Sequence, residues 1–182
     1  MRYRPHDYQR YAADFIKNHP IAALLLSMGL GKTSITLTAI NDLLFDSFEV
    51  SRVLVIAPIR VTRVWAEEIE KWNHLRGLTY SIAVGTAEER RTALSRKADI
   101  YIINRENVGW LIDEMPFDFD MIIIDELSSF KNHQTKRFKA LMKARPKAKR
   151  IVGLTGTPTG NGLMDLYAEF RLLDMGQRLG RF

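Results

Sequence analysis

The sequence predicts an α/β fold with a mostly parallel central sheet and helices on both of its faces. Two observations lead to this prediction. Short apolar runs alternate with amphipathic segments along the chain, and residues 27–33, Ser-Met-Gly-Leu-Gly-Lys-Thr, stand between an apolar run and a segment that can form a helix. Parallel strands need crossover connections, which are usually helices, so this alternation favours a layered α/β domain.

The predicted strands are short runs rich in Ile, Leu and Val, as expected for strands buried on both faces of a parallel sheet. They cover residues 21–26, 52–57, 79–84, 100–103, 121–125 and 150–154. Ligands of such sheets bind at the carboxyl ends of the strands, so the residues that follow these runs are the candidates for function.

Amphipathic segments with apolar residues at helical spacing lie between and around the strands. They predict helices over residues 8–18, 32–44, 62–72, 87–95, 104–113, 135–144 and 162–173. Within residues 62–72, Trp65, Ile69 and Trp72 recur at helical spacing. We expect these three side chains to pack in the core rather than to stack on bases.

Length and composition indicate one domain spanning residues 1–182. A chain of 182 residues with 46% hydrophobic residues can bury one sizeable core and is short for two. It has no cysteine, its four histidines show no ligand spacing, and it has neither an apolar run of membrane-spanning length nor the apolar stretch of a signal peptide. We expect no membrane partner and a cytoplasmic protein, or a nuclear one in a eukaryote.

Residues 28–33 have the composition of a phosphate-binding loop. Glycines let backbone N–H groups turn toward phosphate oxygens, a lysine neutralises β/γ-phosphate charge, and a Thr hydroxyl can ligate Mg²⁺. The full pattern G-x-x-x-x-G-K-[ST] requires glycine at position 26, where this chain has Leu26. The strand and helix on either side still favour a nucleoside triphosphate site over a helix-capping loop. The residues expected to contact the nucleotide are Met28, Gly29, Leu30, Gly31, Lys32, Thr33 and Ser34.

The acidic pair Asp125-Glu126 ends the apolar run that begins at Met121. A carboxylate at such a strand end can hold Mg²⁺, so Asp125 is the expected metal ligand together with Thr33. The adjacent Glu126 can orient and deprotonate the attacking water. The alternative is a pair that only caps the next helix, which the presence of Lys32 and Thr33 in the same chain disfavours.

The net charge of +6 is unevenly distributed along the chain. Residues 131–150 contain nine Lys or Arg residues and no Asp or Glu, a concentration suited to binding phosphate backbones. Phe138, Leu141 and Met142 also give this segment an apolar stripe, opposite which any surface helix carries charges. A nucleic-acid surface and an ordinary solvated helix face both stay open.

The order of these motifs resembles the first motor domain of Swi/Snf-type ATPases in helicase superfamily two. The resemblance covers residues 9 to 174 and is most specific at Leu154-Thr155-Gly156-Thr157-Pro158. It implies a RecA-like lobe that, with a second such lobe, binds ATP and Mg²⁺ in a cleft and moves along double-stranded DNA. The other matching segments are Met-Gly-Leu-Gly-Lys-Thr at 28–33, Ala57-Pro58, residues 64–72, Asp125-Glu126 with Lys131-Asn132, Asn161 and Leu173-Asp174.

The resemblance assigns further roles by position. Gln9 would contact the adenine, although it can also be a polar residue on an amphipathic helix. Arg60 and Arg63 would approach the DNA backbone. Thr155, Gly156 and Thr157 would link nucleotide state to DNA contact, with a plain turn after a strand as the alternative.

Two departures from the family pattern are visible. The usual Asp-Glu-Ala-His is Asp125-Glu126-Leu127-Ser128 here, so Ser128 would have to carry the contact that the histidine makes toward Thr155 or Thr157. The chain ends at Phe182, before any second lobe that would present arginines to the γ-phosphate. We therefore expect a piece of a longer protein or half of a split motor that hydrolyses ATP only with a second lobe. A non-motor P-loop enzyme and a nucleotide-dependent binding module without turnover are the alternatives.

Overall fold

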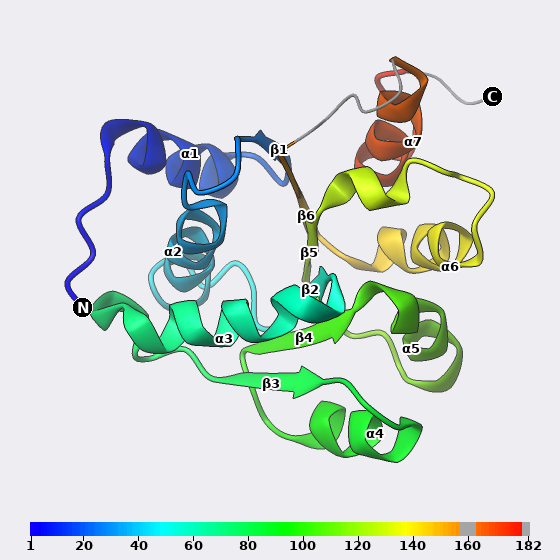
Figure 1. Ribbon diagram of the computed structural model, residues 1–182, viewed down its shortest axis with the longest axis horizontal. Helices are drawn as coiled ribbons and strands as arrows, with labels where there is room; N and C mark the ends of the chain where they lie inside the picture. Colours follow the sequence, from blue (N-terminus) through cyan, green and yellow to red (C-terminus); the bar gives the residue numbers. More distant parts are fainter. Residues whose placement is uncertain (157–162, 180–182) are drawn as a thin grey trace.

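The central element is a six-stranded sheet with the strand order β1-β6-β5-β2-β4-β3 (Figure 1). A computed structural model describes residues 1–156 and 163–179. Within them, every neighbouring pair of strands is parallel, which confirms the predicted mostly parallel sheet. The strands are β1 (Ile21–Leu25), β2 (Val53–Ala57), β3 (Tyr80–Ala83), β4 (Ile100–Asn104), β5 (Met121–Asp125) and β6 (Arg150–Thr155).

Helices cover both faces of this sheet, as predicted (Figure 1). Helices α1, α2 and α3 pack on one face, and α4, α5, α6 and α7 pack on the other. The helices are α1 (Asp7–Asn18), α2 (Lys32–Phe45), α3 (Thr62–Lys71), α4 (Ala87–Ser95), α5 (Val108–Glu114), α6 (Lys136–Ala144) and α7 (Leu163–Asp174).

The predicted helix at residues 104–113 is wrong at its start. Asn104 ends β4, and Arg105–Asn107 form a 3₁₀ turn, η3, before α5 begins at Val108. The parallel pairing of Asn104 with Ala57 keeps this residue in the sheet, so tertiary pairing overrides the local helical pattern. The helix predicted over 62–72 is one residue shorter, because Trp72 is extended with φ −97° and ψ 129°.

The register of β1, β6 and β5 brings three segments of the sequence together at one edge of the sheet. Leu25 of β1 lies beside Thr155 of β6, and the backbone N–H of Leu26 continues this pairing with a 3.1 Å hydrogen bond to the Thr155 carbonyl. On the other side of β6, Leu154 lies beside Asp125. The phosphate-loop segment, the end of β6 and the acidic pair therefore meet at the carboxyl ends of the strands.

A glycine on β6 makes room for the turn that follows the acidic pair. A Cβ at Gly153 would lie 2.6 Å from a methyl carbon of Leu127, which is fully buried on the 3₁₀ turn η4 (Leu127–Phe130). Real Cβ atoms are essentially never that close to another heavy atom. The absence of a side chain at Gly153 thus lets the turn after β5 pack directly on β6.

The basic segment at residues 131–150 contains both buried and exposed cations, and its binding to nucleic acid stays a prediction. Arg145 is buried and donates to the carbonyls of Leu173 (2.9 Å) and Ala148 (3.0 Å), so its charge serves the fold. Arg150 is also buried. The exposed cations of this segment are Lys131, Lys136, Lys139, Lys143, Lys147 and Lys149.

Among the residues described, no helix is long and apolar enough to cross a membrane.

Arg150 connects the start of β6 to the end of α1. Its guanidinium donates to the carbonyl of Ile16 at 2.8 Å and to that of Lys17, and it forms a 2.6 Å ion pair with Glu49. The last carbonyls of a helix have no partner within the helix, so a buried side-chain donor satisfies groups that would otherwise be unpaired.

We predict that Arg150→Met lowers the free energy of unfolding by about 2–4 kcal/mol, because it leaves buried carbonyls without donors while keeping most of the side-chain volume. Urea denaturation, monitored by circular dichroism, measures this change in the free energy of unfolding. The control is Lys149→Met, whose side chain is 70% exposed and which we expect to change stability by less than about 0.5 kcal/mol. Equal stabilities for Arg150→Met and the parent chain would contradict the assignment.

Candidate functional site

The segment between β1 and α2 is a tight loop that turns its backbone inward and its large side chains outward. Gly29 and Gly31 have φ values of +82° and +80°, in the left-handed region that favours glycine. The Met28 side chain is 92% exposed and Leu30 is also exposed. A Cβ at Gly31 would lie 2.6 Å from the Gln9 amide nitrogen, which could shift, so it is the left-handed backbone that favours glycine at this position.

Lys32 opens helix α2 and folds back over the loop. Its ammonium donates to the carbonyls of Leu26 (2.7 Å) and Ser27 (3.1 Å). A Cβ at Gly156 would lie 3.8 Å from this nitrogen, so the residue that follows β6 stands beside the lysine. The positive charge thus lies at the N-terminus of a helix, where backbone N–H groups and the helix dipole also favour an anion.

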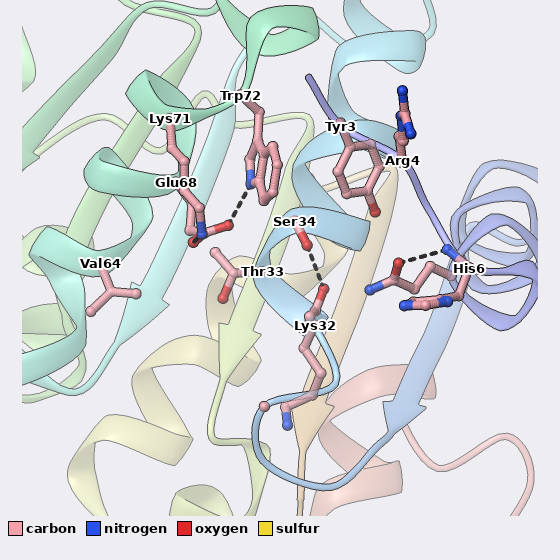
Figure 2. Close-up of a pocket in the computed structure, with 13 residues that line it drawn as sticks. Tyr3, Arg4, His6, Lys32, Thr33, Ser34, Val64, Glu68, Lys71 and Trp72 are labelled. Carbon is pink, nitrogen blue, oxygen red and sulfur yellow. Dashed lines mark hydrogen bonds and ion pairs between the residues drawn. The ribbon is translucent and has the colours of Figure 1, made fainter. Parts of the chain in front are cut away.

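A cavity of about 460 Å³ lies between the loop, the N-terminal segment and α3 (Figure 2). The sticks in Figure 2 come from three parts of the chain that are far apart in sequence. The volume of this cavity falls within the range of small-molecule sites. The lining residues are Tyr3, Arg4, His6, Gln9, Gly29, Gly31, Lys32, Thr33, Ser34, Val64, Glu68, Lys71 and Trp72.

Gln9 joins the first turn of α1 to the loop. Its side-chain oxygen accepts a 2.9 Å hydrogen bond from the backbone N–H of His6, and its amide nitrogen donates to the Leu30 carbonyl at 3.3 Å. The Tyr8 hydroxyl donates to the same carbonyl at 3.2 Å. Gln9 therefore lines the cavity and holds the loop, and its contact with an adenine stays a prediction.

Trp72 packs against the core, as predicted for all three residues, and also lines the cavity. Trp65 and Ile69 are buried, whereas Trp72 is half-buried. The indole N–H of Trp72 donates to Glu68 at 2.7 Å, and its ring meets Tyr3 edge-on at a centroid distance of 5.1 Å. Because α3 ends at Lys71, the extended Trp72 lies between the core and the cavity.

The sequence pattern also missed the segment that precedes Gln9. Tyr3, Arg4 and His6 all line the cavity, and Tyr3 stacks on His74 at a centroid distance of 4.6 Å. Burial raises the pKa of Tyr3 and lowers that of His74, which favours the neutral forms of these two stacked rings. The available signal was the density of aromatic and basic residues in Tyr3-Arg4-Pro5-His6.

Asp125 ends β5 with a carboxyl group that is largely withdrawn from water. One of its oxygens accepts a 2.9 Å hydrogen bond from the indole N–H of Trp65. Burial raises the pKa of Asp125, and the hydrogen bonds from Trp65 and the Glu126 backbone together with the charge of Lys32 lower it only in part. The charge of this carboxylate is only partly compensated by the protein. The chemistry of such an oxygen ligand fits a site for Mg²⁺, whose charge would complete the compensation.

Glu126 lies at the same strand end but faces other partners. Its backbone is left-handed, with φ 60° and ψ 58°, a conformation that costs a non-glycine residue about 1–2 kcal/mol and is common at functional sites. Its carboxylate accepts from Arg105 at 3.0 Å and lies 3.9 Å from the guanidinium of Arg60. Nothing in the motif spacing predicts Arg105 as a neighbour of the acidic pair.

The remaining predicted positions lie around this edge of the sheet. Ser128 is on η4, directly after the acidic pair, and Thr155 is buried at the end of β6. Gly156 is the last residue described before the gap, and Thr157 lies outside the described residues. Arg60, with a side chain that is 79% exposed, is on the 3₁₀ turn η1 (Ile59–Val61), and the exposed Arg63 is on α3.

Sheet topology, the glycine loop and the lysine at the start of α2 define a RecA-like α/β domain of the P-loop class. The chain belongs to the SNF2-related domain family, whose model matches residues 14–178. It is therefore a helicase-like ATPase domain of the SNF2 type.

Relatives and one solved structure support this assignment. The chain is 37% identical to putative protein p41 of Acyrthosiphon pisum secondary endosymbiont phage 1, over 98% of this chain and 41% of that protein. It is 31% identical to the SWI/SNF-related matrix-associated actin-dependent regulator of chromatin subfamily A-like protein 1 of Xenopus tropicalis, over 89% of this chain and 16% of that protein. The Sulfolobus solfataricus SWI2/SNF2 ATPase core in complex with dsDNA superposes with a TM-score of 0.84 at 28% identity, over 96% of this chain and 36% of that one. The chain thus spans less than half of each of these proteins.

We predict that Asp125→Asn stabilises the nucleotide-free chain near neutral pH, because it removes a charge that burial disfavours. Since folding raises the pKa of Asp125, its contribution to stability is greatest below the unfolded value near 3.8 and is lost as pH rises through the folded value. The advantage of the variant should therefore be small at pH 4 and should grow toward pH 7. Urea denaturation at several pH values tests this, and a variant less stable than the parent at pH 7 would contradict it.

Proposed function

We propose that this chain is the ATP-binding lobe of a DNA-dependent ATPase that moves along double-stranded DNA. The observation that supports it most is the convergence of Lys32, Gly156 and the partly buried Asp125 on one edge of the sheet, beside a cavity of about 460 Å³. Such a site combines a cationic cradle for phosphates with a carboxylate for a metal.

In the proposed mechanism the loop backbone and the α2 N-terminus receive the phosphates. Lys32 would exchange its bonds to Leu26 and Ser27 for bonds to phosphate oxygens, which are stronger partners for an ammonium than neutral carbonyls. Thr33 and Asp125 would hold Mg²⁺, which when bound offsets negative charge on the phosphate oxygens. Gln9 would hydrogen-bond to the adenine while keeping Leu30 in place.

Hydrolysis then needs a water in line with the γ-phosphate and a cation for the charge that develops in the transition state. Glu126 would orient the water and accept its proton. Among the described residues we identify no arginine in the cavity apart from Arg4 of the N-terminal segment. We therefore propose that residues 1–182 form one RecA-like lobe and that a second lobe, in the same polypeptide or in trans, supplies the cation.

DNA contact and coupling complete the proposal. Arg60 and Arg63 would bind the DNA backbone, since both are exposed and Arg60 lies beside the acidic pair. Ser128, Thr155, Gly156 and Thr157 would transmit nucleotide state, which the position of Gly156 next to Lys32 supports. The solved neighbour carries bound double-stranded DNA, which supports duplex as the substrate of this chain too.

The proposed function predicts a specific loss of nucleotide binding. Lys32→Ala removes a charge-assisted bond worth about 1.5–3 kcal/mol, which corresponds to about a 10- to 150-fold loss of affinity for Mg²⁺-ATP. Isothermal titration calorimetry measures this loss. Lys139→Ala, on the exposed surface of α6, is the control and should bind ATP like the parent chain. Equal affinities for Lys32→Ala and the parent would remove Lys32 from the site.

The proposed function also makes a prediction about ATP turnover. An arginine at the γ-phosphate is typically worth about 10³–10⁵ in rate, so the 182-residue chain alone should hydrolyse bound ATP very slowly, even with DNA. Adding a matching second lobe should restore DNA-stimulated hydrolysis, and Glu126→Gln should abolish it while ATP binding persists. A steady-state phosphate-release assay decides, and robust DNA-stimulated hydrolysis by the lone monomeric chain would show that the two-lobe mechanism is wrong.

A further inference from the structure

The carboxylate of Glu126 is engaged by arginines rather than by the nucleotide cavity. Arg105 donates to one oxygen at 3.0 Å and Arg60 lies 3.9 Å from the other. Asp125, the other member of the acidic pair, instead accepts a hydrogen bond from Trp65 on α3, the helix that lines the cavity. The group proposed to activate water is thus held by an ion pair in the nucleotide-free protein.

The sheet order explains which way this carboxylate is turned. Strand β5 lies between β6 and β2, with β1 beyond β6 and β4 beyond β2. The phosphate loop follows β1 and packs against the end of β6, whereas Arg60 and Arg105 follow β2 and β4. Glu126, at the end of β5, therefore directs its carboxylate along the edge of the sheet toward β2 and β4, and away from β6 and the loop that follows β1.

Hydrogen bonds within the 3₁₀ turn η3 orient the Arg105 side chain for its contact with Glu126. Its Nε–H donates to Glu106 at 2.8 Å, and the other oxygen of Glu106 accepts from the Asn104 amide at 3.3 Å. The Asn107 amide in turn donates to Asn104 at 2.5 Å. The 3₁₀ turn η3 thus fixes the guanidinium between two carboxylates, Glu106 and Glu126, with the Arg105 side chain only 25% exposed.

We propose that Arg105 is a positioning residue that holds Glu126 away from the nucleotide, and that backbone phosphates of duplex DNA release Glu126 by binding Arg105 and Arg60. This rests on the proposed role of Glu126 in hydrolysis. A guanidinium binds phosphate oxygens with two parallel hydrogen bonds, so a phosphate competes well with a single carboxylate contact. The ion pair itself is partly exposed and shifts an equilibrium by only about two- to fivefold, which makes it reversible.

The hold of Arg105 on Glu126, here called the restraint, is tested on the 182-residue chain by carbon-13 NMR of the Glu126 carboxyl group at a fixed pH of 7.5. The variant Glu126→Gln is used to assign the signal. We expect Arg105→Gln to move this signal. The control, Arg91→Gln, breaks an Arg91–Glu114 ion pair of the same 3.0 Å length on α4 and α5 and should leave the signal unchanged. A Glu126 signal that is the same in Arg105→Gln and the parent would overturn the restraint.

Release is tested by adding a short DNA duplex or inorganic phosphate to the same samples. Duplex should move the parent signal toward its position in Arg105→Gln and should move that variant's signal less, because only the 3.9 Å contact with Arg60 is left to release. Inorganic phosphate should act only at far higher concentration, and equal potency would reassign the site to free phosphate. A parent signal that does not respond to duplex, whether or not duplex binds, overturns release by DNA.

Hydrolysis provides a readout that a merely structural residue would not give. In single-turnover experiments with radiolabelled ATP, Arg105→Gln should raise the slow DNA-free rate about two- to fivefold without changing ATP affinity. The gain should vanish in the Glu126→Gln background. If ATP does not bind the parent chain, the proposed function fails while the NMR result stands. If ATP binds and Arg105→Gln leaves the rate unchanged, the inference fails alone.

Discussion

The parallel pairing of β1, β6 and β5 is the constraint on which the rest of the site depends. Because Leu26 bonds to Thr155 beyond the end of β1, the loop begins at a fixed point beside β6. The loop in turn places Lys32 at the start of α2 and next to Gly156. A shift of one residue in this register would exchange the faces of the strands and separate these groups.

The same edge of the sheet carries charges that the fold itself does not fully compensate. Asp125 is partly buried with a raised pKa, and the neighbouring Glu126 adopts a left-handed backbone conformation. Both features lower the stability of the nucleotide-free protein. A site that binds a metal and a polyanionic nucleotide gains from such features, since the ligands supply the missing compensation.

Much of the fold was predictable from periodicity, because buried parallel strands are continuous apolar runs. The run at residues 121–125 matches β5 to the residue, and the predicted β1 is one residue too long. The errors occur where tertiary contacts decide: Asn104 joins β4 by pairing with Ala57, and Trp72 leaves α3 to line the cavity. Local pattern cannot distinguish such residues from helical neighbours.

The candidate site was predictable where a motif has fixed spacing and not where contacts join distant segments. The glycines and Lys32 could be located from sequence alone, but Arg105 approaches Glu126 across 21 positions, and Tyr3 reaches Trp72 across 69. The basic segment shows the same limit, because Arg145 and Arg150 are buried and serve the fold. Composition alone cannot separate structural from surface cations.

The central claim is that Lys32, Thr33 and Asp125 form the phosphate and metal site of this chain. A crystal structure with Mg²⁺ and a non-hydrolysable ATP analogue tests it most directly. The account predicts that the Lys32 ammonium leaves the Leu26 and Ser27 carbonyls for the β- and γ-phosphates, and that Thr33 and Asp125 lie in the coordination sphere of the metal. An analogue bound elsewhere, or a Lys32 that keeps both carbonyl bonds with the analogue present, would contradict it.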